Sequence, residues 1–413
     1  MKGILVIADG LGGRPTDAGG RTCLEAARTP QLDRLADRGA SGLVDPIRPG
    51  VRPGSDTAHL SLLGYDPHAL YTGRGVFECL GIGLDVQPGD ICFRANFATV
   101  KVDGSELRLV DRRAGRLDSG QRELETALDG MRIGTAGVEV RFRASTEHRG
   151  ALLLRGKSLA PHVSETDPHE IGSAIRDAVP TSAGDAAERT AAAVNDLTRR
   201  SHELLQDHPV NRERASQGKL PANILLVRGA ADCPHIPSIP SIYGVRGAVI
   251  SGGALYRGVA LACGLEAIAV PGATGGLDTD LAAKAGAALA ALGDFDFVFV
   301  HIKGTDNAAH DRDATAKTKF IERIDSEFIR PLAEGLDWST THLAFTGDHT
   351  TSIEYGDHTA DPVPVLFVGP NVVRDGVRTF DERTASGGGL LRFSGQILPM
   401  LMSYMNRCPK YGS

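Results

Sequence analysis

Four short apolar runs constrain the fold of this chain more than any other feature. The runs are ILVIA (4–8), DFVFVHI (296–302), HLAFT (342–346) and PVLFV (364–368). None of them alternates polar and apolar residues, which is typical of strands in a parallel sheet that is covered on both faces. Helical patterns lie between the runs, at 29–39 and 278–293. Strands that alternate with helices predict a doubly wound, mostly parallel α/β sheet.

The middle of the chain differs in composition from its two ends. From about residue 90 to 235 it is richer in arginine and polar residues, with an alternating run at 138–145 and a polar helical pattern at 185–208. We therefore expect two domains, which 413 residues can supply. The core would be discontinuous, formed by residues 1–90 and 236–413. A smaller α+β domain, residues 91–235, would be inserted into it.

Composition narrows the class of protein. A formal net charge of −6 argues against a general nucleic-acid binder. The six cysteines form no CxxC pair, so we expect reduced, buried thiols. The N-terminus shows no cleavage-site pattern, and no apolar run approaches the roughly 20 residues that a membrane span needs. These features predict a cytoplasmic protein with a small-molecule partner, no nucleic acid and no membrane. They leave a homo-oligomer open.

Acidic residues and histidines follow three of the apolar runs. The set is Asp9, Asp306, His310, Asp348, His349 and His358. Sites in open α/β sheets form at the carboxyl ends of the strands, so we expect these side chains to converge. Buried carboxylates need a cation or a proton, and a mixed Asp/His set suits Mn²⁺, Zn²⁺ or related ions. Six such ligands fit two ions with room left for a substrate.

The segment PGSDTAHLSLLG (53–64) contains a serine that has two readings. Ser55 is an ordinary helix-start residue, since serine, aspartate and glycine all favour that position. It is also a candidate nucleophile, because a helix N-terminus favours an alkoxide and then a phosphate. A nearby metal ion would lower the pKa of its hydroxyl. We expect Ser55 to be both the helix start and the nucleophile.

Several longer strings resemble one known family. They are DG (9–10), GSDTAHLSLLGYDP (54–67), YTGRG (71–75), KGTDNAAHD (303–311), GDHTT (347–351) and DPVPV (361–365). In this order they are similar to the archaeal-type 2,3-bisphosphoglycerate-independent phosphoglycerate mutases of the alkaline phosphatase superfamily. The resemblance runs from Met1 to the KYGS end, with shorter matches at 93–100, 146–150, 166–169 and 272–280. It implies an alkaline phosphatase-like core.

The resemblance also implies which residues form the site. Two divalent ions would be bound, Mn²⁺ first, with Zn²⁺, Co²⁺ or Mg²⁺ as alternatives, and no 2,3-bisphosphoglycerate. One ion would be held by Asp9, Ser55, Asp348 and His349, and the other by Asp306, His310 and His358. The residues that would hold phosphoglycerate are His148, Arg149, Asp167, Arg228 and Arg257, with Arg94 and Arg74 as weaker candidates. Arg257 stands where the family often has lysine.

By this resemblance the chain would be an isomerase that interconverts 3-phosphoglycerate and 2-phosphoglycerate through a phosphoserine at Ser55. A metal-dependent phosphatase or phosphodiesterase would share the same metal site. So would a transferase acting on a phosphoglycerate-like or phosphonate metabolite in specialised metabolism. A metal-dependent binding protein without turnover is disfavoured, because a structural site needs no activated hydroxyl. An inserted domain that excludes water while glycerate turns favours the mutase.

Overall fold

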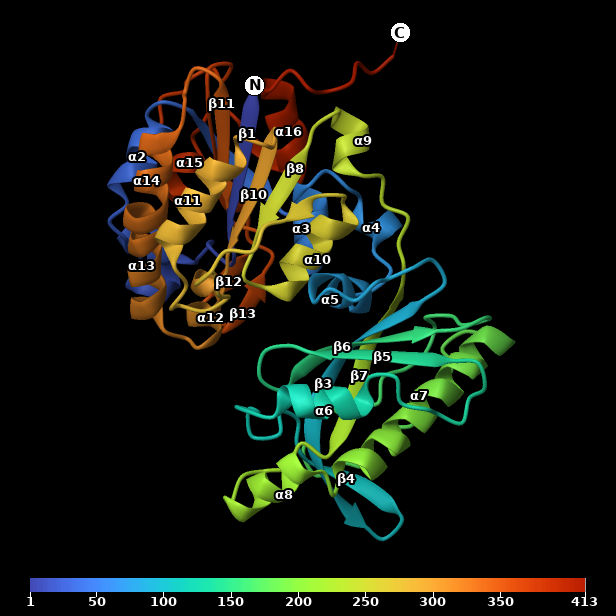
Figure 1. Cartoon of the computed structure of the whole chain (residues 1–413). Helices are drawn as coiled ribbons and strands as arrows, with labels where there is room; N and C mark the ends of the chain where they lie inside the picture. The colour runs from blue at the N-terminus through green and yellow to red at the C-terminus, as the bar shows by residue number, and fades with distance from the viewer. Residues whose placement is uncertain (413) are drawn as a thin grey trace. The chain divides into compact units, whose positions relative to one another are not determined.

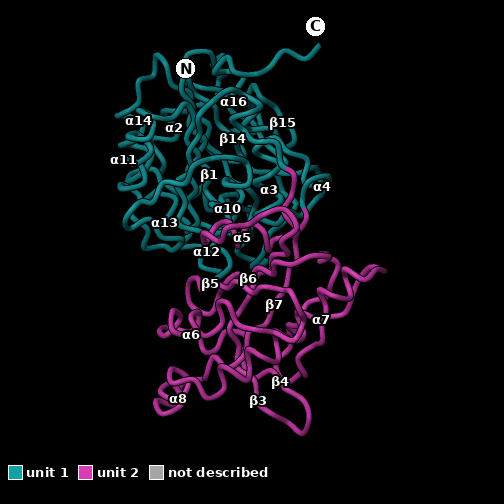
Figure 2. Tube along the Cα trace, turned by 45° about the vertical axis from the view of Figure 1, so that its right-hand side comes forward, with its two compact units in different colours: residues 1–71, 236–413 teal, residues 72–235 magenta. Residues whose placement is uncertain are grey.

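The computed structural model describes residues 1–412, which form two compact units (Figures 1 and 2). The first unit contains Met1–Tyr71 together with Ile236 and the residues after it, and the second is Thr72–His235. The second unit begins ahead of the expected border at 91. The reason is that helix α5 (Gly75–Gly81) packs on strands β3 (Ile91–Asp103) and β7 (Ile224–Asp232) of that unit.

An eight-stranded sheet forms the centre of the first unit, in the order β15–β2–β14–β11–β1–β10–β8–β9. Its strands are β1 (Lys2–Ala8), β2 (Ala40–Asp45), β8 (Gly247–Ile250), β9 (Glu266–Ala267), β10 (Phe297–Ile302), β11 (Thr341–Thr346), β14 (Val363–Val368) and β15 (Leu391–Ser394). Among the described strands of this sheet, β14 alone runs antiparallel to its neighbours. The predicted mostly parallel α/β sheet is therefore confirmed, although the PVLFV run is its antiparallel member.

Helices cover both faces of this sheet (Figure 1). One face carries α2 (Pro30–Ala36), α11 (Leu281–Ala291), α13 (Ala314–Arg323) and α14 (Arg330–Gly335), and the other carries α3 (Ser55–Leu62), α10 (Ala254–Ala262) and α16 (Ile397–Tyr404). Shorter elements of this unit are α1 (Cys23–Ala26), α4 (Pro67–Leu70), α9 (Ile239–Tyr243), α12 (Gly304–His310), α15 (Glu382–Ala385), a 3₁₀ helix (Pro15–Ala18), a π-helical turn (Ile324–Ile329) and the hairpin β12 (Thr350–Ser352) and β13 (Asp357–Thr359).

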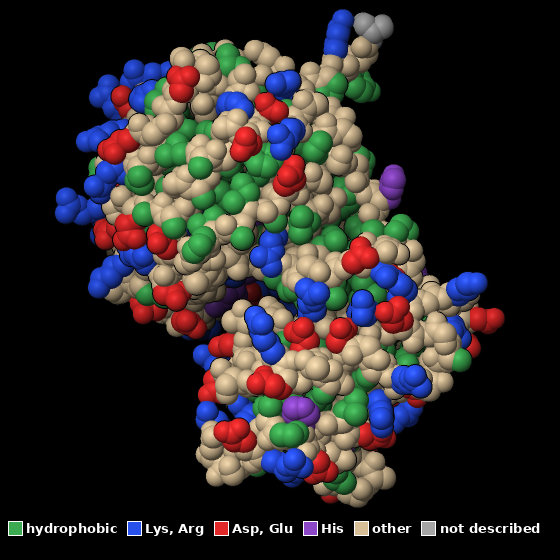
Figure 3. Space-filling model, viewed as in Figure 1, with side chains coloured by type: hydrophobic (Ala, Val, Ile, Leu, Met, Phe, Trp, Pro, Cys, Tyr) green, Lys and Arg blue, Asp and Glu red, His purple; other side chains and the backbone are tan. Residues whose placement is uncertain are grey.

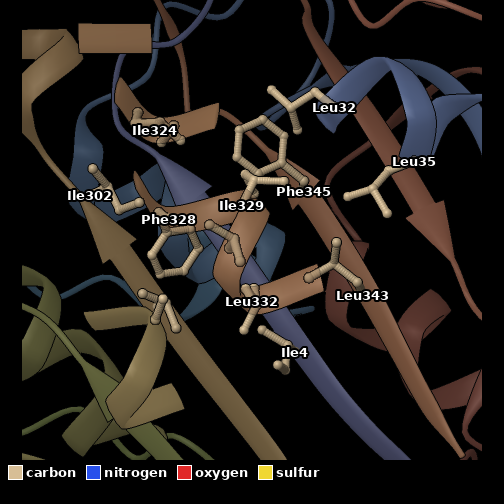
Figure 4. Packing of buried hydrophobic residues seen from close by; sticks show 14 of the residues in the cluster. Ile4, Leu32, Leu35, Ile302, Ile324, Phe328, Ile329, Leu332, Leu343 and Phe345 are labelled. Carbon is tan, nitrogen blue, oxygen red and sulfur yellow. The ribbon is translucent and has the colours of Figure 1, made fainter. Parts of the chain in front are cut away.

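One large apolar cluster of the first unit lies between the sheet and the α2 side (Figure 4). Ile4 of β1 and Phe345 of β11 project from the sheet, and Leu32 of α2 and Phe328 of the π-helical turn project toward them. All four side chains are buried. The apolar positions of the predicted 29–39 helix are thus the ones that face the core, as helical spacing requires.

The second unit is built around a five-stranded antiparallel sheet. Strand β3 pairs with β4 (Glu106–Asp111), β6 (Arg149–Arg155) and β7, and β6 pairs with β5 (Glu139–Ala144). Its helices besides α5 are α6 (Gln121–Leu128), α7 (Asp185–Leu205) and α8 (Pro209–Ser216). Phe93, Phe97 and Phe142 turn one face of the sheet toward an apolar core that includes Leu197 of α7. The alternating run and the polar helix predicted in this region are confirmed as β5 and α7.

Three expectations from composition can be compared with the structure: the absence of a large basic surface, the absence of a membrane span, and the burial of the cysteines. Acidic and basic side chains are interspersed on the face seen in Figure 3, without one large basic patch. No helix within residues 1–412 is long and apolar enough to cross a membrane. Four cysteines are buried, but Cys233 is partly exposed and Cys408 is exposed. The expectation that all six are buried is therefore wrong for these two.

The core packing yields a stability prediction. Phe328→Ala removes a fully buried ring and should lower the free energy of unfolding of the first unit by about 3–5 kcal/mol. The matched control is Val373→Ala, because Val373 is 84% exposed and its loss should change stability by less than about 0.5 kcal/mol. Denaturant unfolding followed by intrinsic fluorescence measures both. A loss below about 1 kcal/mol for Phe328→Ala would contradict this account of the core.

Candidate active site

Three aspartates emerge at one edge of the large sheet. Strand β1 lies between β10 and β11 and runs parallel to both, with Ala8 beside Ile302 and Ile7 beside Thr346. Asp9 follows β1, Asp348 follows β11, and Asp306 lies in α12, which begins just after β10. Their exposed fractions are 0% for Asp9 and Asp348 and 1% for Asp306. Convergence at the carboxyl ends of parallel strands is what the fold requires.

Ser55 is the first residue of α3, but it is not the cap. The N-cap is Gly54, and the Thr57 hydroxyl accepts from the Gly54 amide at 3.2 Å and donates to its carbonyl at 3.0 Å. The Ser55 hydroxyl lies instead 3.2 Å from Nε2 of His349. The expectation that Ser55 starts the helix is confirmed. Its hydroxyl does not cap the helix and points to His349 instead.

A first group of ligand atoms surrounds Nε2 of His349. This nitrogen is 3.4 Å from Oδ1 of Asp9 and 3.3 Å from Oδ2 of Asp348. Neither carboxylate oxygen has a hydrogen-bond partner among the described residues, although both are buried. The other oxygen of Asp348 accepts from the Gly10 amide at 2.9 Å, which fixes the carboxylate plane.

A second group surrounds Oδ1 of Asp306. Nε2 of His310 is 3.4 Å away and Nε2 of His358 is 3.6 Å away. The Nδ1 atoms of these histidines face backbone carbonyls, that of Gly356 for His310 at 3.2 Å and that of Pro53 for His358 at 2.9 Å. A carbonyl can only accept, so each Nδ1 carries a proton, and Nε2 is the ring nitrogen that is turned toward Asp306.

His349 also carries a proton on Nδ1, for a related reason. The Thr351 hydroxyl donates its one proton to Oδ1 of Asp306 at 2.8 Å, so it must accept from Nδ1 of His349 at 2.9 Å. Burial lowers the pKa of His349 to about 3, which keeps the ring neutral as a metal ligand must be. Nε2 of His349 is therefore unprotonated.

The electrostatics of the two groups fit divalent cations. In the first group the unprotonated Nε2 of His349 faces the carboxylate oxygens of Asp9 and Asp348, and lone pairs repel unless a cation lies between them. Burial and the neighbouring Asp9 raise the pKa of Asp348 well above its usual range, whereas Lys303 and His301 overcome burial and hold the pKa of Asp9 well below it. Nitrogen and oxygen donors of this kind suit Mn²⁺ or Zn²⁺.

The predicted ligands all belong to one of these groups, and His349 lies within reach of both. The mutually close sets are Asp9–Asp348–His349, Asp306–His349–His358 and His310–Asp357–His358. Asp357 was not foreseen as a member. Its carboxylate is paired with Arg52, and it is half exposed.

Three further residues at the site escaped the sequence reasoning. Lys303 contacts Asp9 and Asp306, and Nε2 of His301 lies 3.0 Å from Oδ2 of Asp9. His59 is fully buried, with Nδ1 2.6 Å from the Ser55 carbonyl and 3.4 Å from Oδ2 of Asp348. Signals existed: His301 interrupts an apolar run, Lys303 opens the KGTD string, and His59 is four residues after Ser55.

In the second unit, arginines gather on the sheet face opposite the apolar core. Arg94 pairs with Arg228 across β3 and β7, and Asn96 pairs with Arg149 across β3 and β6. Burial lowers the pKa of Arg94 to about 9, helped by the charges of Arg74, Arg228 and Arg149. Nε of Arg228 is buried with no hydrogen-bond partner in the described part of the chain.

The remaining predicted substrate residues differ in their surroundings. Burial and Arg149 lower the pKa of His148 to about 4, so its ring is neutral. Asp167 is held by Arg112 through hydrogen bonds of 2.6 and 3.0 Å. Arg257 belongs to the first unit, on α10, which packs against the Ser55 helix α3. His148 and Asp167 thus lie in the same unit as the arginines, and Arg257 does not.

Comparison with known proteins identifies the family. The model of the family described as 2,3-bisphosphoglycerate-independent phosphoglycerate mutase matches residues 36–211. A protein of that name from Methanopyrus kandleri is 46% identical over 417 residues, covering 100% of this chain and 98% of its own. The chain belongs to this family. A second phosphoglycerate mutase, from Archaeoglobus fulgidus, is 46% identical and covers 100% of both chains.

Solved structures agree with this family assignment. A cofactor-independent phosphoglycerate mutase from Thermoplasma acidophilum is 36% identical, with a TM-score of 0.69 over 98% of this chain and 100% of its own. A protein from Pyrococcus horikoshii is 37% identical, with a TM-score of 0.84 over 100% of this chain and 99% of its own. The expected fold and family are therefore confirmed over nearly the whole length.

The buried carboxylates yield a prediction about the metal-free protein. Asp348→Asn removes a charge that burial disfavours, so with chelator present it should raise the melting temperature at pH 7. The raised pKa means that the native parent loses stability as pH increases from about 4, where the unfolded carboxyl ionises. The gain should therefore vanish below about pH 4 and grow above it.

The control for this prediction is Asp381→Asn, at an N-cap outside the cluster, which should change stability little, because asparagine caps a helix about as well as aspartate does. Scanning calorimetry across pH with and without Mn²⁺ measures all three proteins. With Mn²⁺ the order of parent and Asp348→Asn should reverse, because the variant lacks a charged ligand. An Asp348→Asn protein that is less stable than the parent in chelator would contradict the electrostatic account.

Proposed function

We propose that the chain interconverts 3-phosphoglycerate and 2-phosphoglycerate without 2,3-bisphosphoglycerate, as the names of its relatives describe, and that it does so through Ser55 on a two-ion site. The observation that carries the proposal is the position of the Ser55 hydroxyl, 3.2 Å from the bare Nε2 of His349 at the first ligand group. An unprotonated nitrogen among unpaired carboxylate oxygens is a ligand set, not a hydrogen-bonded structural cluster.

We assign one ion to Asp9, Ser55, Asp348 and His349, and the other to Asp306, His310 and His358, with Mn²⁺ as the favoured metal. When bound, such ions act as Lewis acids on a phosphoryl group and lower the pKa of a nearby hydroxyl. The chain's own contribution is orientation. The Pro53 and Gly356 carbonyls and the Thr351 hydroxyl contact Nδ1 of the three imidazoles, which leaves each Nε2 turned toward the ligand groups.

Ser55 is the proposed nucleophile. Its oxygen would attack phosphorus in line, the bond from phosphorus to the substrate oxygen would break, and phosphoserine would form. The amides at the start of α3 favour the negative charge that develops there. The glycerate hydroxyl at the other carbon then takes the phosphoryl group back, which regenerates Ser55. No external phosphate donor enters the cycle.

The second unit would retain the glycerate. A planar guanidinium binds a carboxylate through two parallel hydrogen bonds, and Arg149 and Arg228 lie on one sheet face with a crowded neighbour, Arg94. An unpartnered, buried Nε on Arg228 supports an anion as the missing partner. Retention distinguishes a mutase from a phosphatase, because a phosphoserine left facing water would hydrolyse.

The first prediction from this mechanism concerns Ser55. Ser55→Ala should melt within a few degrees of the parent, because Gly54 and Thr57 make the helix start. Its rate of forming 2-phosphoglycerate from 3-phosphoglycerate with Mn²⁺ should fall by at least about 10³-fold. The matched control is Ser61→Ala on the same helix, which should keep the parent rate. Acid quench of the parent should trap phosphate on Ser55, and near-normal turnover by Ser55→Ala would overturn the assignment.

The second prediction concerns retention. Arg228→Ala should slow the mutase step and raise the ratio of free phosphate to 2-phosphoglycerate, since glycerate escapes before it is rephosphorylated. Arg199→Ala, an exposed arginine of α7 paired with Asp196, serves as the control and should leave the ratio unchanged. If Arg228→Ala lowers both products equally, Arg228 serves initial binding alone. If the parent itself releases mainly phosphate, the hydrolase reading replaces the mutase.

A further inference from the structure

Lys303 contacts one aspartate of each ligand group. It directly follows β10, and its ammonium lies 3.2 Å from Oδ2 of Asp9 and in closer contact with Oδ2 of Asp306. These are the oxygens that face away from the ligand groups, because Oδ1 of Asp9 faces His349 and Oδ1 of Asp306 faces His310 and His358. In each aspartate, therefore, one carboxylate oxygen faces the ligand group and the other contacts the lysine.

The ammonium lies beside an aromatic ring as well as the two carboxylates. The Tyr256 ring lies 5.4 Å from Nζ of Lys303 and stacks on His301 with centroids 3.5 Å apart. His301 in turn approaches the same Oδ2 of Asp9, at 3.0 Å. Aromatic faces attract a cation, and two carboxylate oxygens are ligands that a divalent ion also accepts. These neighbours therefore favour a positive charge at this position, and the lysine supplies it.

We propose that the ammonium of Lys303 fills a third cation position of the site, so that the chain takes up two divalent ions and not three. The proposal rests on the two-ion function proposed above. It makes Lys303 a positioning residue: it holds Asp9 and Asp306 to one ligand oxygen each, and it adds one positive charge where a divalent ion would add two.

The difference in charge has a functional consequence. Three carboxylates, two divalent ions and one ammonium leave a net charge of about +2, which matches a phosphoryl dianion. A third divalent ion in place of the ammonium would raise this charge to about +3. The site would then hold phosphate more tightly and release product more slowly, since only interactions stronger in the transition state than in the ground state raise the rate.

The test is a metal count on purified, Mn²⁺-loaded protein by elemental analysis. The parent should bind about two ions per chain, Lys303→Ala about three, and Lys303→Arg about two, because arginine restores the charge. Lys319→Ala, an exposed lysine of α13, is the matched control and should bind as the parent does. Lys303→Gln removes the charge but keeps a polar side chain that is only one atom shorter, and it replaces the alanine variant if that one does not fold.

Phosphate affinity gives a second readout that does not depend on turnover. Titration of Mn²⁺-loaded protein with inorganic phosphate should show Lys303→Ala binding about tenfold more tightly than the parent, with a lower kcat and a lower KM. A Lys303→Ala or Lys303→Gln protein that still binds about two ions, with parent phosphate affinity, overturns the inference. A parent that binds one ion or none instead overturns the two-ion function, so the two failures are distinguishable.

Discussion

The structure of the first unit is organised around three carboxylates that cannot be buried without cations. Asp9, Asp306 and Asp348 lie at the ends of adjacent parallel strands, and at most 1% of each is exposed. Isolated charges in such a place cost several kcal/mol each unless they are compensated. The chain compensates part of this cost with Lys303 and His301 and leaves bare oxygens on Asp9 and Asp348 for ligands that it does not itself contain.

The loops that carry these residues are held by other buried polar groups. The fully buried ammonium of Lys317 donates to the Gly12 carbonyl at 2.8 Å and the Thr351 carbonyl at 2.9 Å, which joins the loop after β1 to the loop after β11. Asp17 accepts from the Ser352 hydroxyl at 2.8 Å and the Ile353 amide at 3.0 Å. Because buried groups must keep these partners, the loops have little freedom, and the ligands stay preorganised.

Much of this could be predicted from the sequence, because strands and metal ligands leave local signals. Unbroken apolar runs predicted the strands of the sheet. The aspartates that follow two of these runs predicted that Asp9 and Asp348 lie at its carboxyl edge. Two features were missed. The orientation of β14 depends on pairing with strands that are distant in the sequence. At the start of α3, nothing in the sequence shows that Thr57, and not Ser55, contacts Gly54. Lys303 was also missed, because its charge has meaning only beside Asp9, almost three hundred residues away in the chain.

Each unit brings side chains of like charge close together, negative in the first unit and positive in the second. The first crowds carboxylates and needs cations, whereas the second crowds Arg94, Arg149 and Arg228, and burial with mutual repulsion lowers the pKa of Arg94 to about 9. Glu78, 4.0 Å from Arg94 and 2.8 Å from Arg74, offsets only part of that repulsion. Like charges kept together at a cost to stability are typical of sites whose ligand supplies the balance. Each unit by itself therefore lacks the opposite charge that a ligand would bring: cations in the first unit, and in the second an anion such as a carboxylate, which guanidinium groups bind through two parallel hydrogen bonds.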